Sequence, residues 1–378
     1  MPLTTHHSPH RSEFCSNSFP MAKLFEPLQL GNVTLKNRIA VSPMCEYSSV
    51  DGFANDWHLV HLGSRAVGGA GLIICEATAV SPEGRITPDD LGLWKEEHIP
   101  FLKRITSFLK EHGAVAGVQL AHAGRKGSHQ SPWKGGHLIP PNEEGGWQTV
   151  APSAVPFKEG THPPVALDGA GIRKVIDDFQ LAAKRSVEAG FQTIEIHAAH
   201  GYLLHQFYSP LSNRRTDEYG GSFQNRIRLL LEVLAAVHAV VEKEFPIIVR
   251  ISATDWVEGG WTIGDSVALC KVLKEKGVLL VDCSTGGNIG GVKIPVEPMY
   301  QTPFAEQIKR EAGILTGAVG LITTAQEAEQ IIAEEKADLV LLAREFLRDP
   351  YFPLHAASQL GVDLPWPVQY ERAKPRQG

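Results

Sequence analysis

The stretch that decides the fold is TIEIHAAHGY, residues 193–202. Its first half alternates apolar side chains and is typical of a buried β-strand. Its second half places His197, His200 and Tyr202 where that strand should end. Two imidazoles and a phenol can donate hydrogen bonds to a carbonyl oxygen and deliver a proton beside it. A lone interior histidine is usually a structural core residue, but three polar groups at one strand end favour a functional site.

Strand patterns like this one alternate with helical patterns along the chain. The expected strands are residues 38–42, 72–76, 115–120, 193–196, 247–252, 279–284, 314–316 and 339–342. This alternation, with its eight strands, predicts an α/β fold of the closed (β/α)8 type, a TIM barrel, rather than an open doubly wound sheet. No Gly-x-Gly-x-x-Gly follows an early strand, so the usual sign of a Rossmann domain is missing.

Three segments stand apart from this alternation. Residues 27–37 look like an N-terminal hairpin that caps the barrel floor. Residues 124–171, after the third strand, form a long loop rich in Pro, Gly and Trp, and loops of this length are usually lids or binding loops. Residues 1–20 lack an apolar signal region, and we expect them to be a mobile tail. Residues 21–378 would then form a single domain.

Composition excludes several classes of function. The chain has 378 residues, of which 43% are hydrophobic, so it can bury a large core. Its formal net charge is −6 with no basic block, which makes nucleic acid and anionic membranes poor partners. No apolar run approaches the roughly 20 residues of a membrane helix. The five cysteines show no paired spacing, which favours a reducing, cytoplasmic location and argues against disulfides, a zinc ribbon or an iron–sulfur cluster.

Barrel enzymes build their sites at the C-terminal ends of the strands, and the residues there suit a planar, phosphate-bearing cofactor. Glycine-rich backbone after the seventh strand and Arg344 after the eighth would hold a phosphate. Gln119 offers a donor and an acceptor to an imide edge, and Arg250 could stabilise negative charge on a ring. Glu76 is the only carboxylate in this set of strand ends, so its capacity for a divalent metal is small.

Five blocks of the sequence are specific when taken together. They are SPMC (42–45), QLAHAGRK (119–126), HAAHGY (197–202), SNRRTDEYGG (212–221) and QYER (369–372). With these blocks the chain resembles the Old Yellow Enzyme family of FMN-dependent ene-reductases, and it is most similar to the bacterial xenobiotic-reductase and thermophilic-like branch. The resemblance covers about residues 24–372.

The resemblance implies a site built around FMN. The isoalloxazine would be lined by Pro43, Met44, Cys45, Ala77, Gln119 and Arg250. The phosphate end would be held by Ser284, Gly286, Gly317, Gly320, Ala343 and Arg344. The catalytic residues would be His197, His200, Tyr202 and Cys45. The histidines would bind the substrate carbonyl oxygen, Tyr202 would donate the proton, and Cys45 would tune the flavin. Tyr47 and Arg372 would complete the substrate site.

The implied reaction is reduction of the C=C bond of an α,β-unsaturated carbonyl compound or similar activated alkene, with NADPH as the hydride donor. Arg372 resembles an arginine that reaches into the site of a neighbouring subunit, which implies a homodimer or homotetramer. The implied partners are therefore a small-molecule enone, NADPH and further copies of the chain, with no nucleic acid and no membrane.

Two departures from the family pattern and two alternative functions stay open. Ala343 stands where many relatives have glycine, and Glu46 should put a charge near the mouth of the pocket. One alternative is a metal-dependent barrel hydrolase that uses His197 and His200, although no third ligand is evident. The other is a non-enzymatic flavin redox sensor with Cys45 as a thiol switch. A dienoyl-CoA reductase would need an iron–sulfur cysteine cluster and an extra domain, which we do not expect in this chain.

Overall fold

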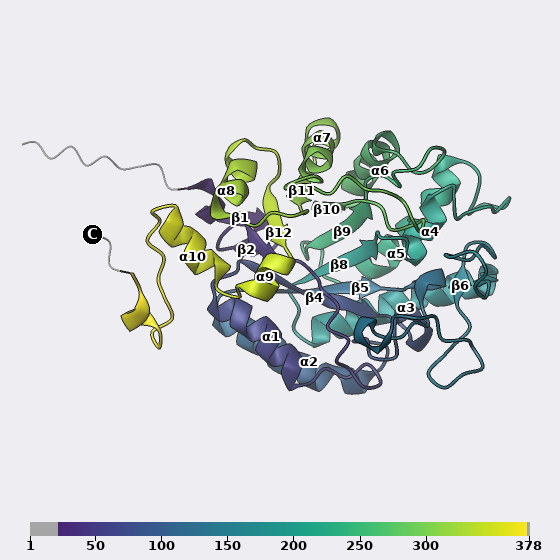
Figure 1. Ribbon diagram of the computed structural model, residues 1–378, viewed down its shortest axis with the longest axis horizontal. Coiled ribbons are helices and arrows are strands. Elements are labelled where there is room, and N and C mark those ends of the chain that lie inside the picture. Colours follow the sequence, from purple (N-terminus) through teal and green to yellow (C-terminus); the bar gives the residue numbers. More distant parts are fainter. Residues whose placement is uncertain (1–21, 376–378) are drawn as a thin grey trace, which may run out of the picture.

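The computed structural model describes residues 22–375, and eight parallel strands close into a barrel in the order β10-β11-β12-β3-β4-β5-β8-β9 (Figure 1). The barrel strands are β3 (Ile39–Val41), β4 (Leu72–Ala79), β5 (Val115–Ala121), β8 (Thr193–Ala198), β9 (Ile247–Ser252), β10 (Leu280–Ser284), β11 (Leu315–Ala318) and β12 (Leu339–Leu342). This confirms the predicted (β/α)8 barrel. The expected tail, residues 1–20, lies outside the described residues.

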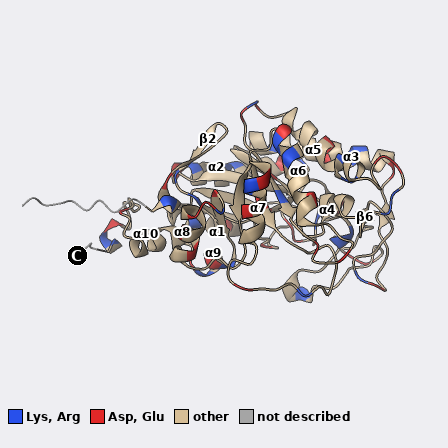
Figure 2. Cartoon of the chain, turned by 90° about the horizontal axis from the view of Figure 1, so that it is seen from above, with Lys and Arg blue, Asp and Glu red and all other residues tan. Residues whose placement is uncertain are grey.

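Helices surround the barrel and bury their apolar faces against its outer surface (Figure 1). They are α1 (Asp56–Val67), α2 (Ile99–Glu111), α3 (Gly169–Glu188), α4 (Leu203–Tyr208), α5 (Phe223–His238), α6 (Ile263–Glu275), α7 (Thr302–Ala312), α8 (Ala325–Ala333), α9 (Arg344–Arg348) and α10 (Phe352–Gln359). Figure 2 shows acidic and basic residues scattered together over these outer helices. Their outer faces are therefore solvated surfaces of mixed charge.

Side-chain caps fix where several helices begin. Asn55, Thr262 and Thr324 each form a capping box with the residue three positions later, at the starts of α1, α6 and α8. Ser222 accepts a hydrogen bond from the backbone of α5 in the same way. Each such cap typically contributes about 1 kcal/mol, because it satisfies backbone N–H groups that have no partner inside the helix. Because of these caps, α5 and α6 begin three to four residues before the apolar periodicity of their sequences becomes recognisable.

The predicted hairpin forms and closes the barrel floor. Strands β1 (Leu28–Leu30) and β2 (Val33–Leu35) pair antiparallel around a turn at Gly31, where φ is +56°. Their leucines pack in one cluster with inward-facing barrel residues such as Ile248 and Leu280. A fully buried leucine contributes roughly 1.5–3 kcal/mol, so this apolar floor is a substantial source of stability. Polar chemistry is thereby confined to the opposite end of the barrel.

The long segment after β5 is not wholly irregular. It contains short 3-10 turns and one small parallel pair, β6 (Val150–Ala151) with β7 (Val165–Ala166). Arg125 ties the segment to the loop after β10, since its guanidinium donates to the backbone oxygens of Val155 and Asn288 at 3.1 and 2.7 Å. The predicted long loop is thus a folded cover beside the barrel mouth.

Candidate active site

One level of the barrel interior, just above the apolar floor, is polar. Its inward-facing residues on neighbouring strands are Ala77, Gln119, Glu195, Arg250, Asp282 and Gly317, and all six are buried. The strand register pairs His197 with Arg250. Residues from six strands therefore meet at the C-terminal end of the barrel, where barrel enzymes carry their sites.

Two carboxylates at this level were missed by the analysis of the sequence. Gln119 donates from Nε2 to Glu195 Oε1 at 2.7 Å, and Arg250 Nε lies 2.9 Å from Asp282 Oδ2. Burial raises the pKa of Asp282, and burial together with Asp282 raises the pKa of Glu195 to about 8. Glu195 and Asp282 each lie two residues before a predicted site residue, His197 and Ser284. Because side chains of a strand alternate between its faces, this spacing of two was the signal that could have revealed them.

The turn after β8 aims the two histidines and the tyrosine. His200 and Gly201 both adopt left-handed backbone, with φ of +57° and +73°. The backbone N–H of His200 donates to Ser252 Oγ at 2.9 Å, and Ser252 Oγ donates to the carbonyl of Gly286 at 2.8 Å. Left-handed backbone is costly for a residue other than glycine. The surrounding hydrogen bonds therefore hold a conformation that this sequence would not adopt in isolation.

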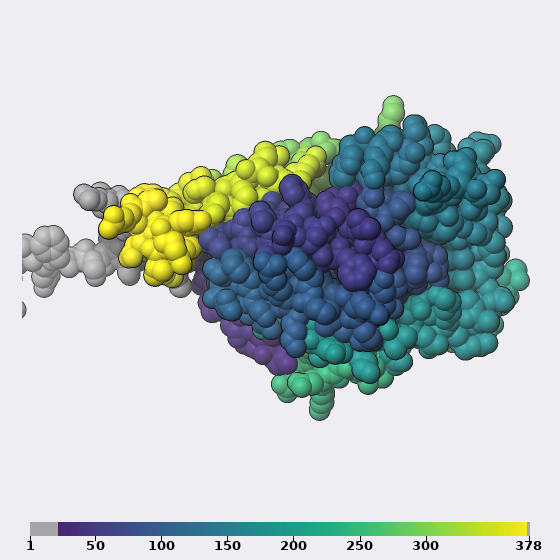
Figure 3. Space-filling view, turned by 90° about the horizontal axis from the view of Figure 1, so that it is seen from below, coloured from purple at the N-terminus to yellow at the C-terminus, as the bar shows by residue number. Residues whose placement is uncertain are grey.

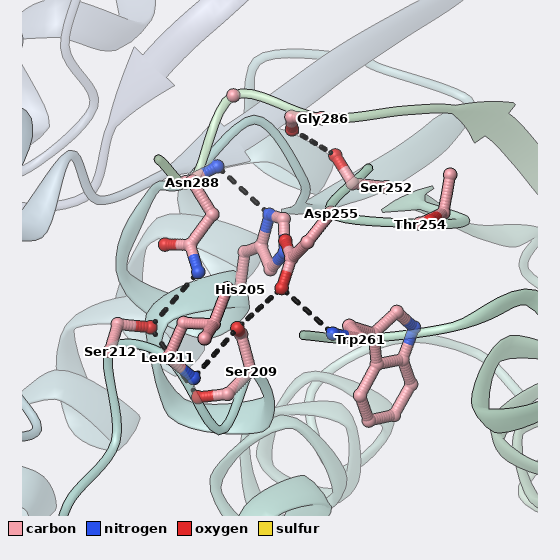
Figure 4. Close-up of polar contacts among 12 residues, drawn as sticks. His205, Ser209, Leu211, Ser212, Ser252, Thr254, Asp255, Trp261, Gly286 and Asn288 are labelled. Carbon is pink, nitrogen blue, oxygen red and sulfur yellow. Dashed lines mark hydrogen bonds and ion pairs between the residues drawn. The ribbon is translucent and has the colours of Figure 1, made fainter. Parts of the chain in front are cut away.

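A buried polar network supports this turn from behind (Figure 4). His205, in α4, accepts at Nδ1 from the backbone N–H of Gly201 at 2.9 Å, and its Nε2 lies 2.8 Å from Asp255 Oδ1. Asp255 also accepts from Ser209 Oγ at 2.6 Å and from the backbone N–H of Trp261 at 2.9 Å. Burial alone would raise the pKa of Asp255, but the hydrogen bonds from His205 and Ser209 hold it below its usual value.

The structure brings the predicted trio together. The ring centroids of His197 and His200 lie 5.3 Å apart, and those of His197 and Tyr202 lie 5.0 Å apart. Burial, followed by the charge of Arg250, lowers the pKa of both histidines well below the usual value, so both are neutral at pH 7. Burial raises the pKa of Tyr202 well above its usual value, so the phenol keeps its proton. Each of the three side chains can therefore donate one hydrogen bond.

The segment after β3 is half-buried and lies beside this trio. The surroundings of its residues Cys45 and Tyr47 differ from those of Glu46. Burial, then the charges of Asp90 and Glu76, raise the pKa of Cys45, so the thiol keeps its proton at pH 7. Tyr47 lies at the mouth, with its ring edge-on to Trp133 at 5.6 Å.

Glu76, expected at a strand end, and Glu46, expected near the mouth of the pocket, both point elsewhere. Glu46 Oε1 lies 3.3 Å from His61 Nε2, and its other oxygen accepts from Trp57 Nε1 at 2.9 Å, so the expectation of a charge at the pocket mouth is wrong. Glu76 sits at a bulge in β4, and its carboxylate lies 3.2 Å from His58 Nε2. Both carboxylates thus face α1, because the bulge turns Glu76 out of the inward-facing alternation.

Beyond β11 and β12 there is a small cavity of about 160 Å³. Gly320, Ala343 and Arg344 line it, together with Tyr300 and Arg348. Arg344 is exposed, and among the described residues no salt bridge neutralises it. The backbone of Gly320 has a φ of +119°, and an added Cβ would come 3.0 Å from Gln301 Nε2. These features suit a phosphate better than a side chain.

The other residues expected at the phosphate end lie lower in the barrel. Ser284 Oγ contacts His200 Nε2 at 2.7 Å and the amide oxygen of Gln301 at 3.3 Å. Gly286 accepts from Ser252, and Gly317 lies against Leu341 in β12. Ser284, at the end of β10, therefore links the histidine pair to the expected phosphate end of the site, because it contacts His200.

Arg372 is remote from the other predicted residues. It lies exposed in a 3-10 turn, Glu371–Ala373, and Figure 1 shows this C-terminal segment extending away from the barrel. It lines none of the cavities at the mouth that involve the described residues. A role for Arg372 in catalysis therefore depends on a second copy of the chain and stays a prediction.

No group of three or more His, Cys, Asp or Glu side chains is arranged to hold a metal ion among residues 22–375. In the same part of the chain no helix is long and apolar enough to cross a bilayer.

Comparison with known proteins agrees with this geometry. Residues 23–363 match the model of the NADH:flavin oxidoreductase / NADH oxidase family. The chain is 52% identical to an NADPH dehydrogenase of Listeria monocytogenes serotype 4a (strain HCC23), over 93% of this chain and 99% of that protein. It is 51% identical to an NADPH dehydrogenase of Geobacillus sp. (strain WCH70), over 92% of this chain and 98% of that protein.

Solved structures share the barrel. Morphinone reductase in complex with tetrahydroNAD superimposes with a TM-score of 0.74 at 28% identity, over 92% of this chain and 93% of that one. A 2-naphthoyl-CoA reductase superimposes with a TM-score of 0.81 at 26% identity, over 91% of this chain but 53% of that one. The larger protein thus has about half its length outside the shared region.

Proposed function

The chain belongs to the NADH:flavin oxidoreductase / NADH oxidase family, so it is an oxidoreductase, and we propose that it uses FMN and NADPH to reduce the C=C bond of α,β-unsaturated carbonyl compounds and similar activated alkenes. The observation that carries this proposal is the cluster of His197, His200 and Tyr202, which gathers three neutral donors beside Arg250 at the barrel mouth. The family match agrees with the resemblance to Old Yellow Enzyme.

The residues present fit FMN. Gln119 and Arg250 offer fixed polar groups from the barrel interior, and the cavity beside Gly320 and Arg344 offers a cation and open backbone. Arg250 forms its ion pair through Nε, and no hydrogen bond of a described residue occupies its terminal nitrogens. We assign the flavin ring to Gln119 and Arg250, and the phosphate to the cavity beside Gly320 and Arg344. Bound FMN would supply hydride transfer, taking hydride from NADPH and passing it to the alkene β-carbon.

The two histidines would stabilise the negative charge that develops on the carbonyl oxygen. Nδ1 of His197 is buried without a partner, so its proton is best placed on Nε2. The Ser284 hydroxyl lies 2.7 Å from Nε2 of His200 and 3.3 Å from the amide oxygen of Gln301, which already accepts from Thr285 at 2.6 Å. We infer that its single proton goes to the nearer acceptor, His200, which leaves the proton of His200 on Nδ1. One N–H of each ring is then available to the substrate. Losing such a donor typically slows a reaction about 10²–10³-fold.

Tyr202 would protonate the α-carbon. Its raised pKa keeps the phenol protonated before the reaction, and its position against His197 puts the proton beside the bound carbonyl. Arg250 would favour the reduced, anionic flavin by charge attraction. Residues 21–378 would then form the single FMN-binding domain, and Arg372 would act in the site of a neighbouring copy within a homodimer or homotetramer.

One experiment tests the proposal. The visible spectrum of the purified protein is recorded, and NADPH and then 2-cyclohexenone are added without oxygen. We expect a yellow protein that NADPH bleaches and the enone restores. The variant His197→Ala/His200→Ala should keep the yellow colour but lose phenol charge-transfer binding and enone turnover.

A matched control removes two histidines outside the site, His112 and His355, and should behave as the wild type. Unchanged enone turnover in the variant without His197 and His200 would reject the assigned roles. A colourless protein loaded with zinc would instead favour a metal-dependent hydrolase.

A further inference from the structure

A large cavity opens between the segment 124–171 and the loop after β3. Its volume is about 610 Å³, within the range of roughly 300–1,000 Å³ for small-molecule sites. Figure 3 shows this blue-green segment at one end of the molecule, opposite the yellow C-terminal end. We call it the loop cavity. Its polar lining on the segment side consists of Arg125, Lys126, His129, Gln130, His137, Lys158, Thr161 and His162.

The charge of this lining is one-sided. Of the fifteen described residues that line the loop cavity, three are Lys or Arg, three are His, and none is Asp or Glu. The whole chain has the opposite balance, with 42 acidic against 36 basic residues. The charge composition of the cavity wall, which has no carboxylate, therefore differs from that of the whole chain. It produces a positive potential that favours an anionic ligand.

The inner cations are held by neutral oxygens instead of by carboxylates. Lys126 Nζ donates to the carbonyls of His200 and Gly287 at 2.7 and 2.9 Å. The guanidinium of Arg125 donates to backbone carbonyls and to the side chain of Asn288. These bonds satisfy the N–H groups but leave the positive charge uncompensated. Burial lowers the pKa of Arg125 to about 10 and that of Lys126 to about 8, so both are mainly charged at pH 7.

The loop cavity adjoins the cluster of His197, His200 and Tyr202 through Lys126, which belongs to its lining. At its inner end, Lys126 Nζ lies 5.0 Å from the ring centroid of Tyr202. The same nitrogen lies 4.6 Å from the ring centroid of Phe157, next to Lys158 in the chain. Lys158 and His137 are exposed at the outer end, and no salt bridge with a described residue neutralises Lys158. A ligand that reacts beside Tyr202 would thus have its far end near Lys158, a cation unpaired among the described residues.

We propose that the loop cavity binds the phosphate groups of NADPH, and that Lys158 at its outer end contacts the 2′-phosphate and makes the enzyme prefer NADPH over NADH. This inference rests on the proposed function, which places the reacting end of the nucleotide beside Tyr202. A dinucleotide carries its phosphate charges far from its reacting ring. It could therefore place the ring near Tyr202 at the inner end of the loop cavity and a phosphate near Lys158 at the outer end. A small anionic alkene would reach the inner cations alone and would leave Lys158 without a role.

The test compares two dinucleotides on one protein. Bleaching of the FMN-loaded enzyme by NADPH and by NADH is followed under anaerobic conditions for wild type, Lys158→Ala and Lys158→Glu. We expect the NADPH/NADH ratio of apparent affinities to fall roughly tenfold for Lys158→Ala, which removes the positive charge and its hydrogen bond. The ratio should fall further for Lys158→Glu, which adds a negative charge that repels the 2′-phosphate. Bleaching by NADH should change less than about twofold, and the wild-type preference should shrink with salt.

The matched control uses Lys134, which lies on the same segment, pairs with Asp89 at 2.7 Å and does not line the loop cavity. Lys134→Ala and Lys134→Glu should keep the wild-type ratio. An equal loss with both dinucleotides, or an unchanged ratio in Lys158→Glu, would overturn the assignment.

Two further outcomes separate this inference from the function on which it rests. A wild type that neither dinucleotide bleaches contradicts the proposed function itself. The dithionite-reduced enzyme is also mixed with maleate and with neutral 2-cyclohexenone. If Lys158→Glu selectively loses reoxidation by maleate while its NADPH/NADH ratio holds, the loop cavity binds anionic substrates, and the NADPH assignment is wrong.

Discussion

His205 and Asp255 form a fully buried pair, with Nε2 and Oδ1 2.8 Å apart. The backbone N–H of Gly201 can only donate, so Nδ1 of His205 must accept and its proton must sit on Nε2, facing Asp255. The carboxylate thereby fixes the tautomer of a residue that holds the left-handed turn between His200 and Tyr202. The geometry of the site is thus anchored in a network that touches no substrate.

Removing this anchor should destabilise the protein. Asp255→Asn puts an amide N–H where the carboxylate accepted from His205, Ser209 or Trp261, and we expect a loss of about 3 kcal/mol in the free energy of unfolding. The pKa of Asp255 is lowered in the fold, so its contribution is present above its usual pKa of 3.8 and is lost as the pH falls through the lower folded value. Urea denaturation at several pH values measures both effects.

The chain offers a matched exposed pair as the control. His355 Nδ1 and Asp349 Oδ2 lie 2.7 Å apart with the histidine half exposed, and Asp349→Asn should cost less than about 1 kcal/mol. A loss for Asp255→Asn no larger than that would show that the buried network does not hold the turn.

Tyr202→Phe should separate the two half-reactions. The phenyl ring keeps the packing against His197 but lacks the proton, so reoxidation by 2-cyclohexenone should slow by about 10²–10⁴-fold. Bleaching by NADPH needs no proton from Tyr202 and should change by less than about threefold. Anaerobic stopped-flow absorbance measures both rates, and Tyr219→Phe, whose hydroxyl contacts Glu232 instead, serves as the control. Equal slowing of both half-reactions would contradict the role as proton donor.

The fold could be predicted from the sequence because its determinants are local. Strands such as β8 are continuous runs of buried residues, and their helices show apolar periodicity. The helix α4 was missed because all six of its residues are buried, so no polar face marks a helical period. The C-terminal end of β11 was predicted two residues too early, since Gly317 and Ala318 carry no strand signal of their own.

The clustering of His197, His200 and Tyr202 could be predicted because the three lie within six residues of one another. Glu195 and Asp282 could not, since their partners Gln119 and Arg250 belong to other strands and meet them through the barrel register. Glu76 misled the prediction because a bulge reverses its direction, and a sequence pattern does not show a bulge. Local chemistry was therefore visible in the sequence, whereas contacts between strands were not.

Glu195 should give the protein a pH-dependent weakness. Its pKa is raised to about 8 in the fold, so between its usual pKa of 4.5 and about 8 the unfolded chain releases a proton that the folded chain keeps. The free energy of unfolding should therefore fall with rising pH over this window, by up to about 1.4 kcal/mol per pH unit, and level off above it. Glu195→Gln keeps an oxygen that accepts from Gln119 and should remove this slope.

Urea denaturation of the FMN-loaded protein from pH 5 to pH 9, a range that covers most of the window and extends about one unit above it, measures the difference between wild type and Glu195→Gln. Glu275→Gln, at an exposed position in α6, should follow the wild-type profile. A pH-independent difference between wild type and Glu195→Gln would mean that Glu195 stays ionised in the fold.

Arg344 should recognise the phosphate of the cofactor and not its ring. Two exposed arginines line the small cavity beside Gly320: Arg348 pairs with Glu345, whereas Arg344 has no salt bridge to a described residue. Arg344→Ala should weaken FMN binding to the apoprotein by roughly 10–100-fold, since it removes a charged hydrogen bond, while riboflavin, which lacks the phosphate, should bind as it does to wild type. Quenching of flavin fluorescence measures both affinities, and Arg310→Ala on the outer face of α7 is the control. If Arg344→Ala weakens riboflavin as much as FMN, the arginine supports the ring site, and the phosphate must be held elsewhere.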